Sequence, residues 1–122
     1  MKKFKELGLS PELLKILKAI GFNEPTDIQE KVIPIAMSGK DVIGESATGS
    51  GKTLAFGAPI LEKVEPGKGI QALVLTPTRE LAMQVSQALS IFSNHHLKIL
   101  PVYGGVSLEP QMDHLRTADI VV

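Results

Sequence analysis

The residues best suited to chemistry in this chain form a glycine-rich segment that closes on lysine and threonine, Thr48-Gly49-Ser50-Gly51-Lys52-Thr53. Gly49 and Gly51 permit positive φ angles, so that successive backbone N–H groups can point into one concavity suited to phosphate oxygens. Lys52 can reach the β- and γ-phosphates of a nucleotide, and the Thr53 hydroxyl can bind a Mg²⁺ held between them. The spacing therefore predicts a phosphate-binding loop.

The elements on either side of this segment are those that such a loop requires. Asp41-Val42-Ile43-Gly44 reads as a short buried strand, and a helix is predicted to begin near Lys52 with the apolar positions Leu54, Ala55, Ala58 and Leu61. The full loop pattern places a glycine where this chain has Ser46, so the match covers its last two-thirds. The alternative is a Gly-Ser-rich surface turn that happens to contain Lys-Thr.

Composition restricts the class of protein further. With 43% hydrophobic residues, 21% charged residues and a formal net charge of zero, the chain is typical of one small globular domain. It contains no cysteine, no apolar run of about 18 residues and no secretory leader, so we expect a cytoplasmic protein without a membrane partner. Neutrality and the low aromatic content, with no tryptophan, argue against broad nucleic-acid recognition, so any such contact must be local.

Helical and strand patterns alternate along the chain. Helices are predicted from the Ser10 cap to Gly21, from the Thr26-x-x-Gln29 capping box to Gly39, after the Thr78 cap, and over residues 108–115. Strands are predicted over residues 70–75, covered on both faces, over 97–102, and from Ile120 onward. This order predicts an α/β fold with a parallel sheet and helices on both of its faces, with binding sites beyond the carboxyl ends of the strands.

Four motifs in this order resemble those of the DEAD-box ATP-dependent RNA helicases, over nearly the whole chain. Residues 21–29 (Gly-Phe-Asn-Glu-Pro-Thr-Asp-Ile-Gln) resemble the Q motif, with Phe4 as its isolated upstream aromatic. Residues 46–53 resemble motif I, with serine where alanine is usual, and Pro77-Thr78-Arg79-Glu80-Leu81-Ala82 resembles motif Ia. Gly104-Gly105, followed by Gln111, is similar to the family's Gly-Gly element. The resemblance implies the N-terminal part of a RecA-like domain.

The resemblance also implies roles for individual residues. ATP or ADP with Mg²⁺ would be bound by Phe4, Phe22, Thr26 and Gln29 and by the loop residues Ser46, Ala47, Thr48, Gly49, Ser50, Gly51, Lys52 and Thr53, of which Lys52 and Thr53 are catalytic and Thr53 binds the metal. Gln29 would contact the adenine edge, unless its amide serves only the capping box. The backbone of single-stranded or duplex RNA would be contacted by Pro77, Thr78, Arg79, Gly104 and Gly105. Without the resemblance, Arg79 is better interpreted as a solvent-exposed residue of the first helical turn, paired with Glu80 or another acid.

Other elements of the family are not found in these 122 residues. No acid stands at the end of an apolar run, where phosphoryl transfer needs a Mg²⁺ ligand, and the Asp-Glu-Ala-Asp and Ser-Ala-Thr elements are missing. We therefore expect a sheet that is incomplete at its C-terminus, with a Q-motif helical segment (1–39) and a partial nucleotide-binding domain (40–122). The final Ile-Val-Val run would leave an apolar edge open to self-association or to the remainder of the helicase. A chain of this kind would lack turnover by itself.

Two other classes of function remain open at this point. One is a non-catalytic nucleotide-binding or assembly module built from a helicase fragment. The other is a different P-loop enzyme, such as a small-molecule kinase, which has no stated need for the Pro-Thr-Arg-Glu-Leu stretch.

Overall fold

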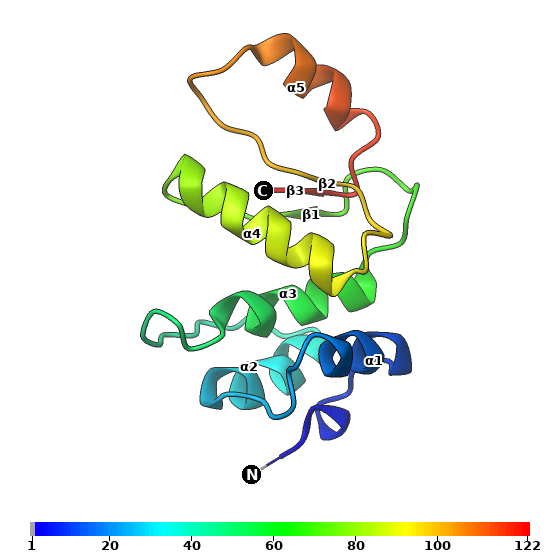
Figure 1. Ribbon diagram of the computed structural model, residues 1–122, viewed down its shortest axis with the longest axis vertical. Coiled ribbons are helices and arrows are strands. Elements are labelled where there is room, and N and C mark those ends of the chain that lie inside the picture. Colours follow the sequence, from blue (N-terminus) through cyan, green and yellow to red (C-terminus); the bar gives the residue numbers. More distant parts are fainter. Residues whose placement is uncertain (1) are drawn as a thin grey trace. The chain divides into compact units, whose positions relative to one another are not determined.

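The computed structural model describes residues 2–122, which divide into two compact units, residues 2–63 and 64–122 (Figure 1). The first unit contains the 3₁₀ helix η1 (Phe4–Glu6) and the helices α1 (Pro11–Ala19), α2 (Asp27–Met37) and α3 (Lys52–Lys63). The second contains the strands β1 (Ala72–Leu73), β2 (Ile99–Leu100) and β3 (Ile120–Val121) with the helices α4 (Arg79–Phe92) and α5 (Leu108–Leu115).

The helix boundaries follow the capping signals of the sequence. The Ser10 hydroxyl accepts a hydrogen bond from the Leu13 N–H, with Pro11 in the first turn, and the Thr78 hydroxyl accepts one from the Leu81 N–H. Gly21 and Gly39 take φ angles of +90° and +88° just after α1 and α2. Because residues with a side chain rarely adopt such φ angles, glycine is suited to these positions, and each helix ends where the sequence predicts.

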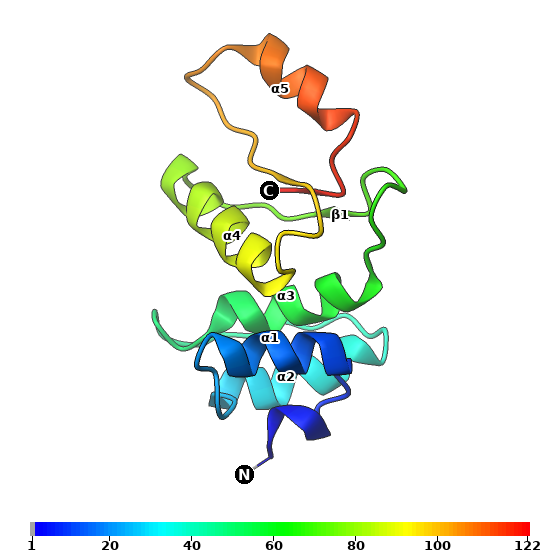
Figure 2. The same ribbon diagram turned by 45° about the vertical axis from the view of Figure 1, so that its right-hand side comes forward.

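The first unit is built around the apolar faces of its helices, and α2 packs against α3 (Figure 2). Its buried residues include Leu13 and Leu17 of α1, Ile33 of α2 and Leu54 of α3. Glu62 near the end of α3 accepts hydrogen bonds from the backbone N–H and the hydroxyl of Ser10, at 3.2 and 2.9 Å. The cap of α1 is thereby attached to the helix that follows the glycine-rich loop.

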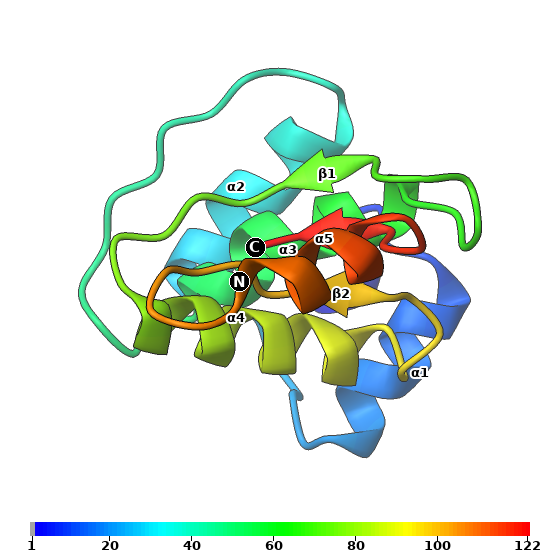
Figure 3. The same ribbon diagram turned by 90° about the horizontal axis from the view of Figure 1, so that it is seen from above.

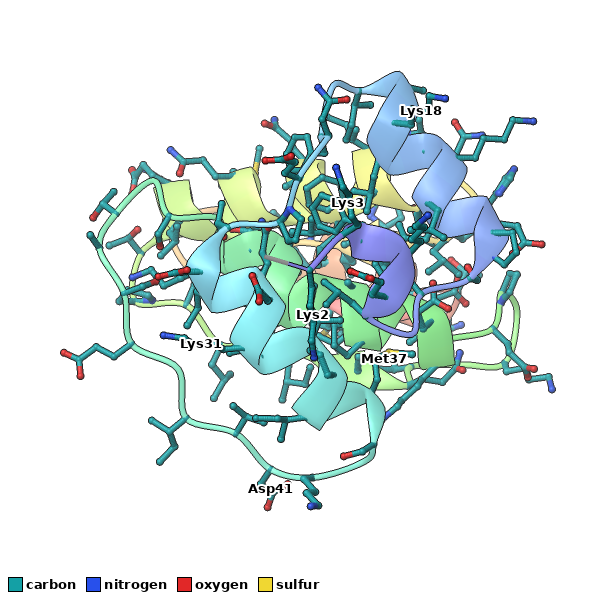
Figure 4. The ribbon with its side chains drawn as sticks, turned by 90° about the horizontal axis from the view of Figure 1, so that it is seen from below. Lys2, Lys3, Lys18, Lys31, Met37 and Asp41 are labelled. Atoms are coloured by element: carbon teal, nitrogen blue, oxygen red, sulfur yellow. The ribbon has the colours of Figure 1, made fainter. Side chains whose placement is uncertain are left out.

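The strand predicted at Asp41–Gly44 is wrong. Residues 41–47 form neither helix nor strand, and Ile43 is fully exposed at 102% of its reference area. The segment between α2 and α3 follows a wide path, and Asp41 lies on its outer side (Figures 3 and 4). A short apolar run becomes a strand only when a neighbouring strand pairs with it, and within the described residues this run has no such partner. Gly44 instead lies against α2, where a Cβ would come within 3.2 Å of the Ile28 and Val32 side chains.

The second unit contains a parallel three-stranded sheet in the order β1-β3-β2, which confirms the predicted parallel α/β arrangement. Ile120 lies in register with Ala72 on one side and with Ile99 on the other. The ladder continues past the labelled strands, since the Val74 N–H donates to the Val121 carbonyl and the Val102 N–H to the Val122 carbonyl, each at 2.9 Å. Figure 3 shows β3 between its two neighbours, and α4 contacts β2.

Two expectations about this sheet are wrong. The final Ile-Val-Val run is not an exposed edge: it forms the central strand, and all three of its residues are buried. The edge of this sheet is therefore formed by β1 and β2 and not by the Ile120–Val122 run. The run at residues 70–75 is not covered on both faces, because Leu73 and Leu75 are exposed while Ala72 and Val74 are half-buried. This alternation of exposed and half-buried residues is typical of a strand with one face open to solvent.

Asp119 holds the start of β3 in place. Its carboxylate, 2% exposed, accepts hydrogen bonds from the N–H groups of Gly67 at 2.9 Å and Lys98 at 2.8 Å. One side chain thus joins the turn before β1 to the chain entering β2. Among the described residues, no helix has the length and apolar character needed to cross a membrane.

Candidate functional site

Gln29 is a polar side chain of the first unit that makes two hydrogen bonds. It is buried, with 1% of its area exposed, near the start of α2. Its Oε1 accepts a hydrogen bond from the Thr26 N–H at 2.9 Å, which is its part of the predicted capping box. Its Nε2 donates to the carbonyl of Gly51 at 3.2 Å, inside the glycine-rich loop. The side chain therefore caps a helix and joins two motifs that lie 22 residues apart.

Gly51 is the point at which this connection meets the loop. Its φ is +87°, and a Cβ added there would overlap Gln29 Nε2 and lie 3.1 Å from the Thr26 hydroxyl. The Gly51 carbonyl also accepts from the Ala55 N–H at 3.2 Å, in the first turn of α3. Only glycine satisfies both the backbone angle and the space, which confirms the positive φ expected at this position.

A cavity of about 540 Å³ opens at this junction. It is lined by residues of the predicted Q motif and of the glycine-rich loop: Gly21, Phe22, Asn23, Glu24, Thr26, Gln29, Gly49 and Gly51. Its volume lies within the range of about 300–1,000 Å³ that is usual for small-molecule sites. Residues from both motifs thus meet at one hollow in the first unit.

The remaining loop residues continue from this cavity toward α3. The Ser50 N–H donates to the Ala47 carbonyl at 3.2 Å, and the Ser46 and Ser50 hydroxyls are 2.5 Å apart. Thr48 is exposed, and Gly49 has a φ of +81°. The backbone therefore turns tightly, as a phosphate-binding loop requires, with a serine pair across it.

Lys52 and Thr53 occupy the first two positions of α3. The Lys52 side chain is exposed and Thr53 is half-buried, so the amine is accessible at a helix N-terminus, where the dipole favours anions. Among residues 2–122, no group of three acidic, histidine or cysteine side chains could hold a metal ion. A single hydroxyl at Thr53 fits Mg²⁺ only in the P-loop manner, in which nucleotide phosphates supply further oxygen ligands.

The two aromatic residues expected near the nucleotide differ in position. Phe22 lines the cavity and is 37% exposed, so its ring is accessible to a ligand. Phe4 is buried in η1 and is not among the lining residues. Its segment is joined to the Q-motif region by an ion pair of 3.5 Å between Lys3 and Glu24 (Figure 4 labels Lys3). Phe4 is therefore a buried residue of this segment and does not line the cavity.

A second cluster of predicted residues lies in the second unit. Pro77 and Thr78 precede α4, and Arg79 is its exposed first residue. The guanidinium of Arg79 lies over the ring of Tyr103, 5.9 Å from its centroid. A Cβ at Gly105, whose φ is +83°, would lie 3.3 Å from Arg79 Nη1. Motif Ia and the Gly-Gly element thus meet at Arg79.

Arg79 is exposed, as its alternative interpretation expected, but the pairing with Glu80 or another acid is wrong, because within the described part of the chain Arg79 forms no ion pair. Gln111 of α5 supports the same loop: its Oε1 accepts from the Tyr103 N–H at 2.9 Å and its Nε2 donates to the Ser107 carbonyl at 3.1 Å. Sequence reasoning missed Tyr103, although it is the only tyrosine and directly precedes Gly104-Gly105. Its place beside the two glycines was the sequence signal that could have identified it as part of this cluster.

Comparison with known proteins shows the family to which this fold belongs. The model of the DEAD/DEAH box helicase family matches residues 26–122. The chain belongs to this family. It is 50% identical over 118 residues to the DEAD-box ATP-dependent RNA helicase CshA of Geobacillus kaustophilus strain HTA426, covering 95% of this chain and 25% of that helicase. The chain therefore spans about a quarter of the length of this relative.

Solved helicase structures share the fold. A crystal structure of a DEAD box protein from Methanococcus jannaschii superposes with a TM-score of 0.93 at 44% identity, over 98% of this chain and 34% of that one. The RNA helicase Prp28 from Chaetomium thermophilum, bound to ADP, gives a TM-score of 0.87 at 41% identity. The match covers 100% of this chain and 32% of the Prp28 chain. The expected RecA-like α/β fold is confirmed, and the small-molecule kinase alternative is not supported.

Proposed function

We propose that this chain is the ATP-binding N-terminal portion of an ATP-dependent RNA helicase, which couples ATP hydrolysis to local unwinding of RNA duplexes. The observation that carries the nucleotide site is the position of Gln29, hydrogen-bonded to Thr26 and Gly51 beside a cavity that both motifs line. The family supports the same assignment, as does the similar helicase bound to ADP.

Adenine recognition is compatible with the hydrogen bonds that Gln29 already makes. A glutamine amide can accept two hydrogen bonds and donate two. The observed bonds to Thr26 and Gly51 use one acceptor site and one donor, so one of each is left. Adenine presents a neighbouring donor and acceptor that match this pair, whereas guanine presents acceptors at the corresponding edge. Gln29 can therefore act as the helix cap and the adenine contact together, with Phe22 packing on the base.

The phosphates would bind along the loop toward α3. The N–H groups of Gly49, Gly51, Lys52 and Thr53 and the amine of Lys52 would bind the β- and γ-phosphates, and Thr53 would hold Mg²⁺. ATP supplies the free energy for the reaction of the whole helicase. The residues of this chain bind and orient the nucleotide, which is the larger part of what protein contributes to phosphoryl transfer.

RNA would be contacted at the edge formed by Pro77–Arg79 and Gly104–Gly105. The start of α4 offers unpaired backbone N–H groups, and Arg79 adds a positive charge beside them. Such groups bind the sugar-phosphate backbone and carry little sequence information. We therefore expect weak sequence preference.

We further propose that the 122-residue chain binds nucleotide without turning it over. Phosphoryl transfer needs an acidic Mg²⁺ ligand, and within residues 2–122 none follows a strand, since Asp119 precedes β3 and serves the sheet. Opening a duplex costs about 1.4 kcal/mol per stacked step in DNA, which backbone binding alone does not supply. The alternative is a non-catalytic assembly module that acts with the remainder of a helicase. The division into a Q-motif segment (1–39) and a partial nucleotide-binding domain (40–122) stays a prediction.

The test is a titration of the pure chain with a fluorescent adenine nucleotide in Mg²⁺, with unlabelled ATP and GTP as competitors. Displacement by ATP and not by GTP is the expected result. The variant Gln29→Glu keeps the acceptor and loses the donor, so its preference for ATP should fall, while Glu12→Gln, an exposed change in α1, should leave it unchanged. Equal displacement by both nucleotides would refute the role of Gln29, and no binding would refute a preformed site.

A further inference from the structure

The ring of Tyr103 is the least explained feature of the Arg79 cluster. It is half-buried, and the Arg79 Cζ lies 5.9 Å from its centroid, within the distance of about 6 Å at which a cation is attracted to an aromatic face. The backbone of Tyr103 is held from α5, because its N–H donates to Gln111 Oε1 at 2.9 Å. The ring is therefore attached to a fixed piece of backbone while Arg79 is exposed to solvent.

Gly105 limits where the guanidinium can lie. A Cβ at this residue would come within 3.3 Å of Arg79 Nη1, and the φ of +83° already disfavours any side chain there. Arg79 thus has an aromatic face beneath it and bare backbone beside it. This explains why the residue after Tyr103-Gly104 is a second glycine.

The way in which Arg79 is held leaves its hydrogen-bonding groups available. A cation–π contact uses the face of the guanidinium, whereas bidentate binding of phosphate uses its N–H edge. A carboxylate partner would occupy that same edge, and Arg79 has none among residues 2–122. A mobile arginine side chain also loses much rotamer freedom when it binds a ligand. Stacking on an aromatic ring restricts the side chain before binding, so less freedom is lost in the binding step.

We propose that Tyr103 is a positioning residue that holds the Arg79 guanidinium ready for a phosphodiester of single-stranded RNA. This inference rests on the proposed function, in which Pro77–Arg79 and Gly104–Gly105 contact the RNA backbone. Tyr103 acts through Arg79 by means of its ring, so its hydroxyl is dispensable. Removing the ring should therefore affect RNA binding only while Arg79 is present.

The test measures the affinity of the 122-residue chain for a fluorescent oligouridylate over a series of KCl concentrations. Arg79→Ala should weaken binding and lower the salt slope by about 0.7 for one lost phosphate contact, whereas Arg116→Ala, a matched loss of charge at the end of α5, should do neither. Tyr103→Leu should weaken binding by roughly two- to fivefold, as expected for an exposed cation–π contact. Tyr103→Phe should bind like wild type, and Tyr103→Leu should add nothing in the Arg79→Ala background.

A spectroscopic measurement separates positioning from a general loss of folding. The chain has two arginines, Arg79 and Arg116, so their side-chain NMR signals can be assigned by substitution. The Arg79 signals should carry a ring-current shift that Tyr103→Phe retains and Tyr103→Leu removes, with Arg116 as the internal reference. If Tyr103→Leu fails to fold, Tyr103→Phe and Arg79→Lys replace it: lysine keeps the charge without the planar stack and should bind more weakly than arginine.

The outcomes distinguish the inference from the function on which it rests. If wild type does not bind RNA, or Arg79→Ala binds as well as wild type, the proposed RNA edge is wrong and the role of Tyr103 falls with it. If Arg79→Ala weakens binding but Tyr103→Leu does not, or if the effect of Tyr103→Leu persists without Arg79, the RNA edge stands and the positioning role is refuted. An unshifted Arg79 signal in wild type would also refute it.

Discussion

The substitution Gly51→Ala would test the junction between Gln29 of the predicted Q motif and the glycine-rich loop, and Gly49→Ala provides a matched control. Both glycines have positive φ, +87° at Gly51 and +81° at Gly49. A Cβ at Gly49 would meet nothing within 4 Å, whereas one at Gly51 would overlap Gln29 Nε2 and lie 3.1 Å from Gln29 Cδ. The two variants therefore share the backbone cost and differ in the contact with Gln29.

The expected magnitudes follow from these contacts. Placing alanine in the left-handed region costs about 1–2 kcal/mol in either variant. Gly51→Ala must also displace Gln29, whose side chain is 1% exposed and bonded to Thr26 and Gly51. A buried polar group that loses its partner costs about 1–3 kcal/mol more. We expect Gly49→Ala to lower the free energy of unfolding by about 1–2 kcal/mol and Gly51→Ala to lower it by about 2–5 kcal/mol.

The assay combines urea denaturation with the nucleotide titration. Unfolding midpoints at equal m-values give the two free energies of unfolding. Under conditions in which both variants are folded, Gly51→Ala should bind the adenine nucleotide at least about tenfold more weakly than Gly49→Ala, because about 1.4 kcal/mol corresponds to tenfold. Shortening the obstructing side chain in Gly51→Ala/Gln29→Ala should recover part of the stability that Gly51→Ala loses.

Equal effects of the two glycine substitutions on stability and on binding would refute the reasoning. Such a result would mean that Gln29 moves aside without cost and does not join the two motifs. An additive double variant would lead to the same conclusion, because residues in direct contact are expected to couple.

Three further substitutions probe separate features. Lys52→Ala removes an exposed amine, so its stability should stay within about 0.5 kcal/mol of wild type while nucleotide affinity in the same titration falls at least about tenfold. Asp119→Asn leaves one side-chain oxygen for the two N–H groups of Gly67 and Lys98, so urea denaturation should show that the free energy of unfolding falls by about 1–3 kcal/mol. The control Asp113→Asn, at an exposed residue, should change it by less than about 0.5 kcal/mol. Ser46→Ala should lower the free energy of unfolding by about 1 kcal/mol, measured by thermal unfolding, because it removes the hydroxyl that lies 2.5 Å from that of Ser50. If the losses of Ser46→Ala and Ser50→Ala add in the double variant, the hydroxyl pair contributes nothing to stability.

The local elements of this chain were predictable from its sequence. Ser10, Thr26 and Thr78 begin helices, and Gly21 and Gly39 end them, because capping depends on groups within a few residues of one another. The family could be predicted for the same reason, since its motifs are short runs of neighbouring residues.

The sheet could be predicted only in outline. The parallel alternation was correct, but the pairing of strands is a long-range property that no local run encodes. The Ile120–Val122 run, expected at an edge, lies at the centre, and the apolar run at Asp41–Gly44 has no strand partner among the described residues. Whether an apolar run becomes a central strand, an edge or an exposed loop depends on which neighbours pair with it.

The sequence by itself determined the helix boundaries, the positive-φ glycines of the glycine-rich loop and the family, because each depends on the spacing of nearby residues. Only the tertiary structure decided that Gln29 bonds to Gly51 across 22 residues, that Asp119 accepts from the N–H groups of both Gly67 and Lys98, and that the ring of Tyr103 lies beneath Arg79. Each of these contacts joins residues far apart along the chain, so its existence depends on the fold that brings the two side chains or backbone groups within a few ångströms of one another.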